Sequence, residues 1–277
     1  MIEIKDLAFS YGNVPVLKSI TTTLEEGRIY GLLGENGVGK TTLLTLLCGL
    51  KRVTGGSITT DGENPFDRTP SLLHNQYYLP DEVLPVPMKA ESFAKERGRF
   101  WPNYDHTRFL GIMREFENDP DKKMSQMSAG QLKKVYISLA LACGCKYIFM
   151  DEPTNGLDIP SKAQFRGAIM KYTSEASTIV ISTHQVRDLE NIIDPIMILD
   201  RQDVLLNATV EEITGRLYFD YGTQLHPESL YSEQLPGGFI QVRPNTTGED
   251  SKINVEALFN AVHKNKELIK GMFNNKQ

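Results

Sequence analysis

A glycine-rich segment near the N-terminus could bind the phosphate groups of a nucleotide. It fits the pattern G-x-x-x-x-G-K-[ST], in which backbone N–H groups wrap a phosphate and the following helix directs its positive end toward it. Lys40 would neutralise phosphate oxygens, and the hydroxyl of Thr41 would ligate Mg²⁺. The segment follows an expected strand at residues 28–33 and opens an expected helix at residues 40–50. The predicted nucleotide site comprises Gly34, Glu35, Asn36, Gly37, Val38, Gly39, Lys40, Thr41 and Thr42.

Two acidic residues at the end of an apolar run could perform hydrolysis. Residues 147–150 are typical of a strand buried on both faces, and Asp151 and Glu152 follow directly. Carboxylates at the carboxyl end of such a strand would lie beside the glycine-rich segment. Asp151 could then hold Mg²⁺ through water, and Glu152 could polarise an attacking water as a general base. Taken alone, the pair would more simply be two solvated acids, but the glycine-rich segment upstream favours the catalytic interpretation.

Further motifs follow in a fixed order and together resemble those of the ABC (ATP-binding cassette) ATPase family. Residues 127–131, Met-Ser-Ala-Gly-Gln, resemble its signature sequence, and residues 151–154, Asp-Glu-Pro-Thr, its second Walker motif. Residues 156–158, Gly-Leu-Asp, resemble its D-loop, and residues 182–184, Ser-Thr-His, its switch histidine. The resemblance covers roughly residues 1–205. It implies an α/β P-loop NTPase fold and ATP hydrolysis with Mg²⁺.

The resemblance also implies roles for individual residues. Tyr11 would stack on adenine, Asp158 would belong to the D-loop, and His184 would hydrogen-bond the γ-phosphate and the attacking water. The signature would contact the nucleotide of an opposite subunit, so that two ATP molecules are sandwiched in a homodimer or heterodimer of such chains. A hydroxyl, backbone N–H groups and a helix N-terminus can contact a phosphate together. The signature residues are Ser128, Ala129, Gly130 and Gln131.

Two positions depart from the family pattern. Ala129 replaces the usual third-position glycine; its methyl group is tolerable at negative φ but would crowd a close phosphate. Asp81 stands where the family has a glutamine between the core and the helical subdomain. An acid there could reach Mg²⁺ through water, so Asp81 is a tentative metal residue. Gln76 lies five residues too early to take the glutamine's role.

An aromatic segment at residues 99–105 includes Trp101 and Tyr104. It resembles a segment of the bacterial bacitracin-exporter-like branch of the family, which would suggest export. Packing of these aromatic side chains within the helical subdomain is an equally good interpretation.

The elements that position these residues alternate between strands and helices, which predicts a mainly parallel sheet. An antiparallel hairpin at residues 2–10 and 20–24 is expected to precede it. Beyond residue 150, we expect a helix beginning near Ser161, a strand at residues 178–182, another helix, and a strand at residues 196–199.

Domain organisation follows from where the pattern changes. An ABC ATPase domain is expected at residues 1–205, with a helical subdomain inserted at about residues 82–142. Residues 206–277 form a small accessory region with Gly, Pro, Asn and Thr clusters, ending in a helical stretch at residues 255–272. No motif indicates what this region does.

Composition restricts the class of protein. The longest apolar stretches fall well short of the ~20 residues that a membrane helix needs, and no signal-peptide pattern opens the chain. A net charge of -5 without a basic run makes nucleic acid an unlikely main partner. The three cysteines, Cys48, Cys143 and Cys145, indicate buried thiols rather than a disulfide framework or a four-ligand metal site.

The leading interpretation is the ATP-hydrolysing subunit of a transporter, peripheral on the cytoplasmic face of a bacterial inner membrane and docked on a separate permease. The alternative is a soluble ABC ATPase acting on a ribosome, DNA or an assembly scaffold. A third class, an ordinary P-loop kinase or GTPase, should lack the Ser-x-Gly-Gln motif and the switch histidine in this order. The presence of both in this sequence makes that class improbable.

Overall fold

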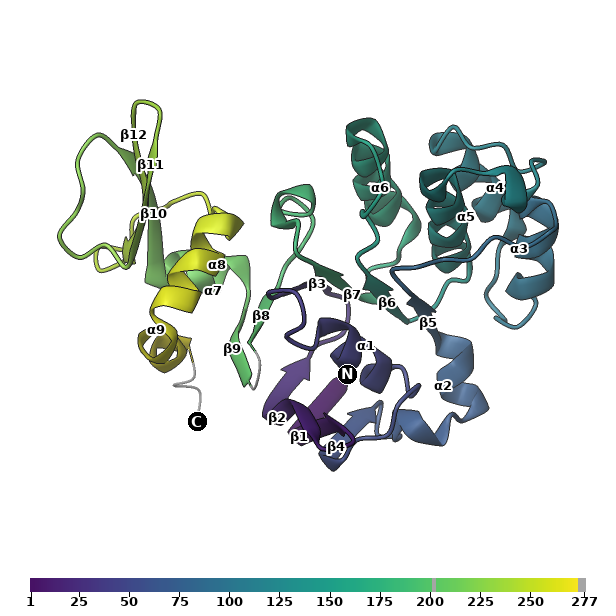
Figure 1. The fold of residues 1–277 in the computed structure, drawn as a ribbon, viewed down its shortest axis with the longest axis horizontal. Coiled ribbons are helices and arrows are strands. Elements are labelled where there is room, and N and C mark those ends of the chain that lie inside the picture. The colour runs from purple at the N-terminus through teal and green to yellow at the C-terminus, as the bar shows by residue number, and fades with distance from the viewer. Residues whose placement is uncertain (201–202, 274–277) are drawn as a thin grey trace.

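A six-stranded sheet forms the centre of the protein (Figure 1). The computed structural model describes residues 1–200 and 203–273. The strand order is β5-β6-β7-β3-β8-β9, with parallel pairing throughout except for β9, which is antiparallel to β8. The predicted mainly parallel α/β fold is therefore confirmed. The strands are β3 (Ile29–Leu33), β5 (Gln76–Leu79), β6 (Tyr147–Asp151), β7 (Thr178–Thr183), β8 (Ile196–Asp200) and β9 (Asp203–Ala208).

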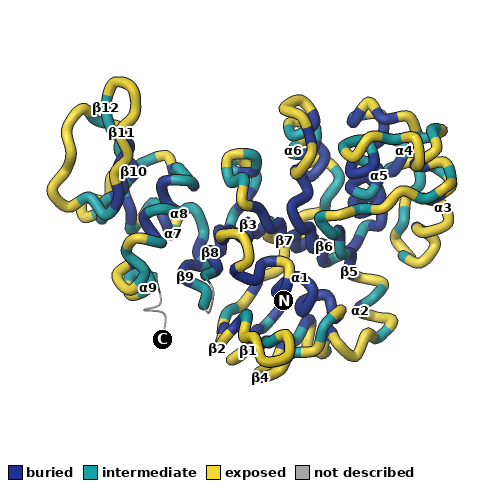
Figure 2. The backbone as a smooth tube through the Cα atoms, in the orientation of Figure 1, coloured by how far each residue is buried: buried dark blue, intermediate teal, exposed yellow. Residues whose placement is uncertain are grey.

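Both faces of this sheet are covered, which explains why its strands are apolar throughout. On β6, Ile148 and Met150 belong to one hydrophobic cluster with the helices α5 (Ala129–Ala142) and α6 (Ile159–Tyr172). Phe149 belongs to a second cluster with α1 (Lys40–Leu47) and the N-terminal strands. Because successive side chains of a strand point to opposite faces, an unbroken apolar run fills both clusters. Figure 2 shows the central strands as the most continuously buried part of the chain.

The N-terminal strands form a separate antiparallel sheet below the main one in Figure 1. The predicted hairpin is present, with Ile2 opposite Leu24 and Tyr11 opposite Val14. A third strand, β4, pairs with β1 and was not predicted. Its sequence, Gly-Gly-Ser-Ile-Thr-Thr, has little of the apolar alternation that marks a strand. The strands are β1 (Ile2–Tyr11), β2 (Val14–Leu24) and β4 (Gly55–Thr60).

The segment between β5 and β6 is helical, as predicted, and lies beyond the β5 edge of the sheet (Figure 1). Two short elements lie between β4 and β5: the turn η1 (Pro65–Asp67) and α2 (Pro70–Asn75). Within the described ranges, no helix has the length and apolar character to cross a membrane. The helical lobe contains α3 (Ala90–Gly98), α4 (His106–Glu115), the turn η2 (Met124–Gln126) and α5.

The helix expected between β7 and β8 is wrong: among the described residues, only the 3-10 turn η3 (Val186–Asp188) is present there. Tertiary contacts replace helical ones in this connection. Arg166 of α6 donates to the main-chain oxygen of Asp188 at 2.9 Å, which would otherwise accept a bond within a helix. Pro195 lacks an N–H and restricts the backbone of Asp194 before it, so a helix could not run into β8.

The C-terminal part folds as a module beyond β9, at the opposite edge of the sheet from the helical lobe (Figure 1). A three-stranded antiparallel sheet, in the order β10-β12-β11, was not predicted. The expected helical stretch at residues 255–272 is two helices, which break at Asn265. The expected boundary at residues 205/206 falls inside β9. The module contains α7 (Val210–Arg216), β10 (Leu217–Gly222), β11 (Tyr231–Leu235), β12 (Gly238–Pro244), α8 (Val255–Lys264) and α9 (Lys266–Phe273).

Candidate functional site

The glycine-rich segment is the turn that connects β3 to α1. Gly37 and Gly39 have φ angles of 81° and 110°, which side chains other than glycine rarely adopt. A Cβ on Gly39 would lie 2.8 Å from Leu17 Cδ2, and one on Gly34 would lie 2.7 Å from the main-chain oxygen of Leu199. A Cβ on Gly37 would meet nothing within 4 Å, so this backbone borders open space. The turn can therefore offer N–H groups to a ligand.

Lys40 lies inside this turn. Its side chain is 7% exposed, and its ammonium donates to the main-chain oxygens of Gly34 at 2.7 Å and Glu35 at 3.2 Å. Burial lowers the pKa of Lys40, while the nearby carboxylates of Glu152 and Asp151 act in the opposite direction. A buried cation beside an open turn is suited to neutralising phosphate oxygens.

Asp151 is fixed from two sides at the end of β6. One carboxylate oxygen accepts from the hydroxyl of Thr41 at 2.6 Å, and the other accepts from the hydroxyl of Ser182 on β7. The structure thus brings together the two predicted metal residues, Thr41 and Asp151. Sequence reasoning missed Ser182 as an orienting group and also Tyr78, whose pKa is raised by burial and by the charge of Asp151. Neighbouring strands supply both residues, so only strand order could have revealed them.

Glu152 and His184 contact each other directly. Nδ1 of His184 lies 2.9 Å from Oε1 of Glu152, and the same oxygen lies 3.9 Å from Nζ of Lys40. Glu152 has a φ angle of 44°, an uncommon backbone region for a residue other than glycine, and its N–H bonds to Ser182 of β7. Glu152 is 8% exposed, so its carboxylate is shielded from bulk water.

The signature residues form the start of α5 on the helical lobe. Ser128 caps the helix: its hydroxyl accepts from the N–H of Gln131 at 3.2 Å, and the Gln131 side chain accepts from the N–H of Ser128 at 3.1 Å. Ala129 is the first helical residue and is not among the residues with positive φ, so its methyl group causes no backbone strain. A Cβ on Gly130 would lie 3.1 Å from the main-chain oxygen of Gly156, which indicates a close approach to the D-loop.

Tyr11 and Asp158 occupy the ends of other elements. The Tyr11 ring is 48% exposed, its hydroxyl lies 3.3 Å from the hydroxyl of Thr42, and Lys51 lies over its face at 4.6 Å. The ring is therefore beside α1 and accessible to a planar group. Asp158 caps α6 by accepting from the N–H of Ser161 at 3.0 Å.

Asp81 lies where the core, the helical lobe and the D-loop meet. Its carboxylate lies 3.5 Å from the ammonium of Lys133 on α5 and accepts from Asn155 at 3.3 Å. The Lys133 ammonium also bonds to the main-chain oxygen of Asp81. Lys133 is 4% exposed, and burial lowers its pKa while Asp81 opposes that shift. Lys133 gave no motif signal, because only the fold brings α5 against the end of β5.

These residues fit a nucleotide with Mg²⁺. The open turn at Gly37 and the buried ammonium of Lys40 suit phosphate, and the hydroxyl of Thr41 and carboxylate of Asp151 are the hard oxygen donors that Mg²⁺ prefers. No group of three or more His, Cys, Asp or Glu residues positioned for a metal occurs in the described part of the chain. Mg²⁺ beside a nucleotide usually takes one or two protein oxygens and completes its ligands with phosphate and water, which fits the pair Thr41 and Asp151.

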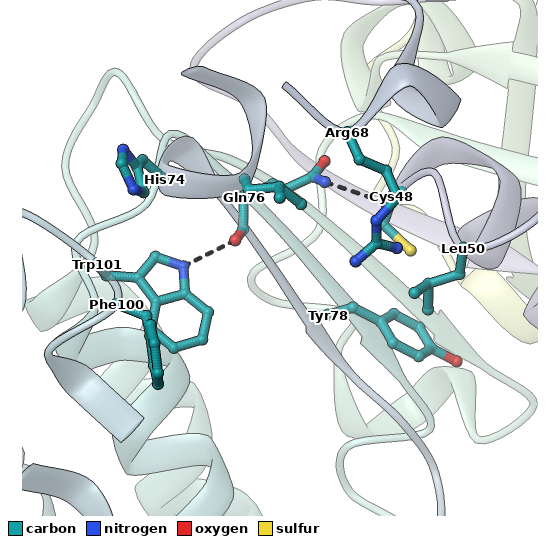
Figure 3. A pocket seen from close by; sticks show the side chains of 9 residues that line it. Cys48, Leu50, Arg68, His74, Gln76, Tyr78, Phe100 and Trp101 are labelled. Atoms are coloured by element: carbon teal, nitrogen blue, oxygen red, sulfur yellow. Dashed lines mark hydrogen bonds between the residues drawn. The ribbon is translucent and has the colours of Figure 1, made fainter. Parts of the chain in front are cut away.

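Apart from the P-loop, a cavity of about 350 Å³ opens between α2, the end of α1 and the helical lobe (Figure 3). Gln76 crosses its floor: its amide donates to the main-chain oxygen of Cys48 at 3.0 Å, and its own main-chain oxygen accepts from the indole of Trp101 at 3.0 Å. The buried Oε1 of Gln76 has no hydrogen-bond partner. Trp101 thus packs between the helical lobe and the core, and Phe100 beside it is 56% exposed.

The fold and the glycine-rich turn define a P-loop nucleotide-binding protein of the α/β class. A sequence model of the ABC transporter family, described as "ABC transporter", matches residues 17–155. The chain therefore belongs to the ABC transporter family of ATP-binding proteins.

Curated relatives agree with this assignment. The chain is 30% identical over 218 residues to the ABC transporter ATP-binding protein YtrB of Bacillus subtilis, covering 77% of this chain and 73% of that protein. It is 27% identical to the lantibiotic transport ATP-binding protein SrtF of Streptococcus pyogenes, covering 85% and 97%. Both proteins are similar to this chain along most of its length.

Solved structures agree as well. One titled as the ATP-binding subunit of an ABC transporter has a TM-score of 0.70 at 25% identity and covers 77% of this chain and 91% of that chain. A dimeric ATP-binding cassette with ADP and Pi has a TM-score of 0.67 at 21% identity and covers 76% and 99%. At 21% identity, the dimeric cassette shows similarity to this chain in fold alone.

Proposed function

We propose that this chain binds and hydrolyses ATP as the ATP-binding subunit of an ABC transporter whose membrane permease is a separate protein. The observation that carries the proposal is the position of the Glu152 carboxylate. Its Oε1 lies 2.9 Å from Nδ1 of His184 and 3.9 Å from Nζ of Lys40. A candidate base, a histidine bonded to it and a phosphate-neutralising cation meet beside the P-loop. The relatives named as transporter ATP-binding proteins support the transport role and not the soluble alternative.

ATP with Mg²⁺ would supply the phosphoryl group and part of the charge neutralisation. The N–H groups of the turn and Lys40 would hold the phosphates, and Thr41 and Asp151 would hold the cation, with Ser182 fixing Asp151. Glu152 orients and polarises the attacking water, because its shielded carboxylate is a stronger hydrogen-bond acceptor than a solvated one. His184 keeps that carboxylate in place through its contact with Oε1 of Glu152 and would contact the transferred phosphate.

The signature motif serves the nucleotide of a second subunit. Ser128 and Ala129 lie on the helical lobe, and the exposed start of α5 is available to a neighbouring molecule. Two copies arranged head to tail would bring each signature to the other's P-loop. A solved structure of similar fold is a dimer, which supports pairing of two such chains. ATP would then favour the closed pair, and loss of the γ-phosphate would release it.

The permease docks on the cavity between the helical lobe and the core. Phe100 and Leu50, which border it, are 56% and 49% exposed, large fractions for apolar side chains. Exposed apolar side chains beside a cavity fit the apolar face of an amphipathic helix of a membrane protein. The chain would thus sit at the membrane surface.

Affinity purification of the tagged chain from detergent-solubilised native membranes tests the proposal. We expect a multi-span protein to co-purify and to stimulate ATP hydrolysis. Lys40→Ala should abolish that hydrolysis without releasing the partner, because Lys40 is inside the turn and far from a docking surface. Phe100→Asp should release the partner but leave basal hydrolysis unchanged. Recovery of ribosomes or DNA-bound proteins instead of a membrane protein would refute the transport role.

A further inference from the structure

The connection that carries His184 is held from one side by α6. We call residues 184–188 the switch loop. Nζ of Lys162 donates to the side-chain amide of Gln185 at 2.8 Å and lies 2.7 Å from the carboxylate of Asp188. Arg166 donates to the main-chain oxygen of Asp188 at 2.9 Å. Both basic residues lie on the helix that begins at the D-loop, so this side of the switch loop is fixed by the ATPase core itself.

The other side of the switch loop faces α8 of the C-terminal module. Nε of Arg187 donates to Oε2 of Glu256 at 2.6 Å. α8 packs against η3, and a cavity of about 270 Å³ lies between them. Its lining joins the P-loop and the switch loop to the module: Gly34, Glu35, Thr183, His184, Val186, Glu256, Phe259 and Asn260. A helix far along the sequence thus borders the space next to His184.

α8 is held in place by apolar packing and by hydrogen bonds to the rest of its module. Val255, Leu258 and Val262 are buried in the same hydrophobic cluster as the core helices. Asn260 donates to the hydroxyl of Tyr231 on β11 at 3.1 Å, which ties α8 to the module's sheet. The module is in turn joined to the main sheet, because Lys266 of α9 pairs with Asp200 at the end of β8. Movement of the module would therefore be transmitted to the switch loop.

We propose that the C-terminal module positions the switch histidine for ATP hydrolysis, through the Arg187–Glu256 pair and the packing of α8 against the switch loop. The inference rests on the proposed function, since it concerns the rate of the same hydrolysis. Arg187 and Glu256 are positioning residues: their charged groups pair with each other and act on His184 through the loop backbone. The module thereby sets the rate of turnover and leaves nucleotide binding to the P-loop.

Because the Arg187–Glu256 pair is exposed, it can form and break without unfolding the protein, and the position of His184 can change with it. The side chains of Arg187 and Glu256 are 80% and 43% exposed, and pairs of this kind contribute little to stability. The position of His184 matters more, because its ring must lie within hydrogen-bond distance of Glu152. A contact that is weak in stability can thus still be decisive for catalytic geometry.

Steady-state ATP hydrolysis and binding of a fluorescent ATP analogue test the inference in the full-length chain. Arg187→Glu places two like charges together, so kcat should fall by about three- to tenfold, while affinity for the analogue stays within about twofold. Combining Arg187→Glu with Glu256→Arg restores an opposite-charge pair and should recover at least about half of the lost rate. Glu256→Gln, a milder change, should lower kcat by about twofold.

Arg28→Glu is the matched control. It disrupts another exposed Arg–Glu pair, Arg28 with Glu25 at 3.7 Å, away from the switch loop, and should leave kcat unchanged. An Arg187→Glu chain that hydrolyses ATP at the wild-type rate, or a charge swap that restores nothing, would overturn the inference alone. A wild-type chain that binds ATP but does not hydrolyse it would overturn the proposed function and, with it, this inference.

Discussion

The nucleotide site and the seam between the core and the C-terminal module hold charged groups in opposite ways. At the site, Lys40, Asp151 and Glu152 are each less than 9% exposed and bonded to one another or to neighbouring strands. At the seam, Arg187 and Glu256 meet on the surface. Removing one partner of a buried set leaves an uncompensated charge, whereas an exposed pair contributes about 0–1 kcal/mol. The site is therefore built for fixed geometry, and the seam for adjustment.

Glu152→Gln should show the largest effect. The substitution keeps the shape of the side chain but removes the base, so hydrolysis should fall by about 100-fold or more. Binding of ATP should persist, because the P-loop is untouched, and the chain should become trapped as a dimer with ATP. Single-turnover hydrolysis and size-exclusion chromatography with ATP measure both effects. A variant that stays monomeric with ATP and keeps its turnover would contradict the sandwich mechanism; Glu211→Gln, an exposed residue of α7, is the control.

Ser182→Ala should have the next largest effect. Loss of its hydroxyl removes one bond to Asp151 and one to the N–H of Glu152. Two groups of the site would then be less well oriented, and kcat should fall by about tenfold, or ~1.4 kcal/mol. ATP turnover at saturating Mg²⁺ measures this loss. Thr183→Ser, which keeps a hydroxyl at the neighbouring position, should retain most of the activity; equal losses in both variants would mean that Ser182 has no special role.

Lys266→Ala tests the seam through stability. Lys266 is 41% exposed and its partner Asp200 is 23% exposed, so the lost ion pair should reduce the free energy of unfolding by less than about 1 kcal/mol. Urea denaturation would measure the loss, which should shrink at high salt because ions screen exposed charges. A loss of several kcal/mol would show that the seam behaves like the buried site and would remove the contrast between them.

The smallest effect is expected at another exposed contact. Hydrogen bonds from Lys171 and from Tyr172 hold the pKa of Glu115 below its usual range and join α4 to the end of α6. A folded-state pKa below the unfolded value adds stability that is present above the unfolded pKa, about 4.3, and is lost as the pH falls through the folded value. Glu115→Gln should thus cost a few tenths of a kcal/mol at pH 7 and progressively less below about pH 4. Denaturation at both pH values measures it; a pH-independent difference would exclude this ionic origin.

The sequence predicted the elements whose signals are local. The strand before the P-loop and the apolar strand ending at Asp151 are confirmed, because an unbroken apolar run is enough to mark a strand buried on both faces. The helix expected after β7 is wrong, since Arg166 and Lys162 satisfy polar groups of that connection from another helix. In the C-terminal module, β11 was missed because its sequence, Tyr-Ser-Glu-Gln-Leu, has three polar residues at its centre and no apolar alternation.

Some site residues could be assigned from motifs in the sequence, and others could be assigned only from the fold. The order and spacing of motifs alone placed Lys40, Asp151, Glu152 and His184 in one proposed site. No spacing in the chain relates His184 to Glu256, or Asp81 to Lys133, although the fold brings each pair together.

The sequence by itself determined the family, the nucleotide and the candidate hydrolytic residues, because each depends on a short motif whose backbone conformation is nearly self-contained. The tertiary structure alone decided what supports those residues: the hydroxyl of Ser182, the charge of Lys133 and the helix α8 against the switch loop. Such contacts depend on strand order and helix packing, which join segments far apart in the chain and leave no periodic trace in the sequence.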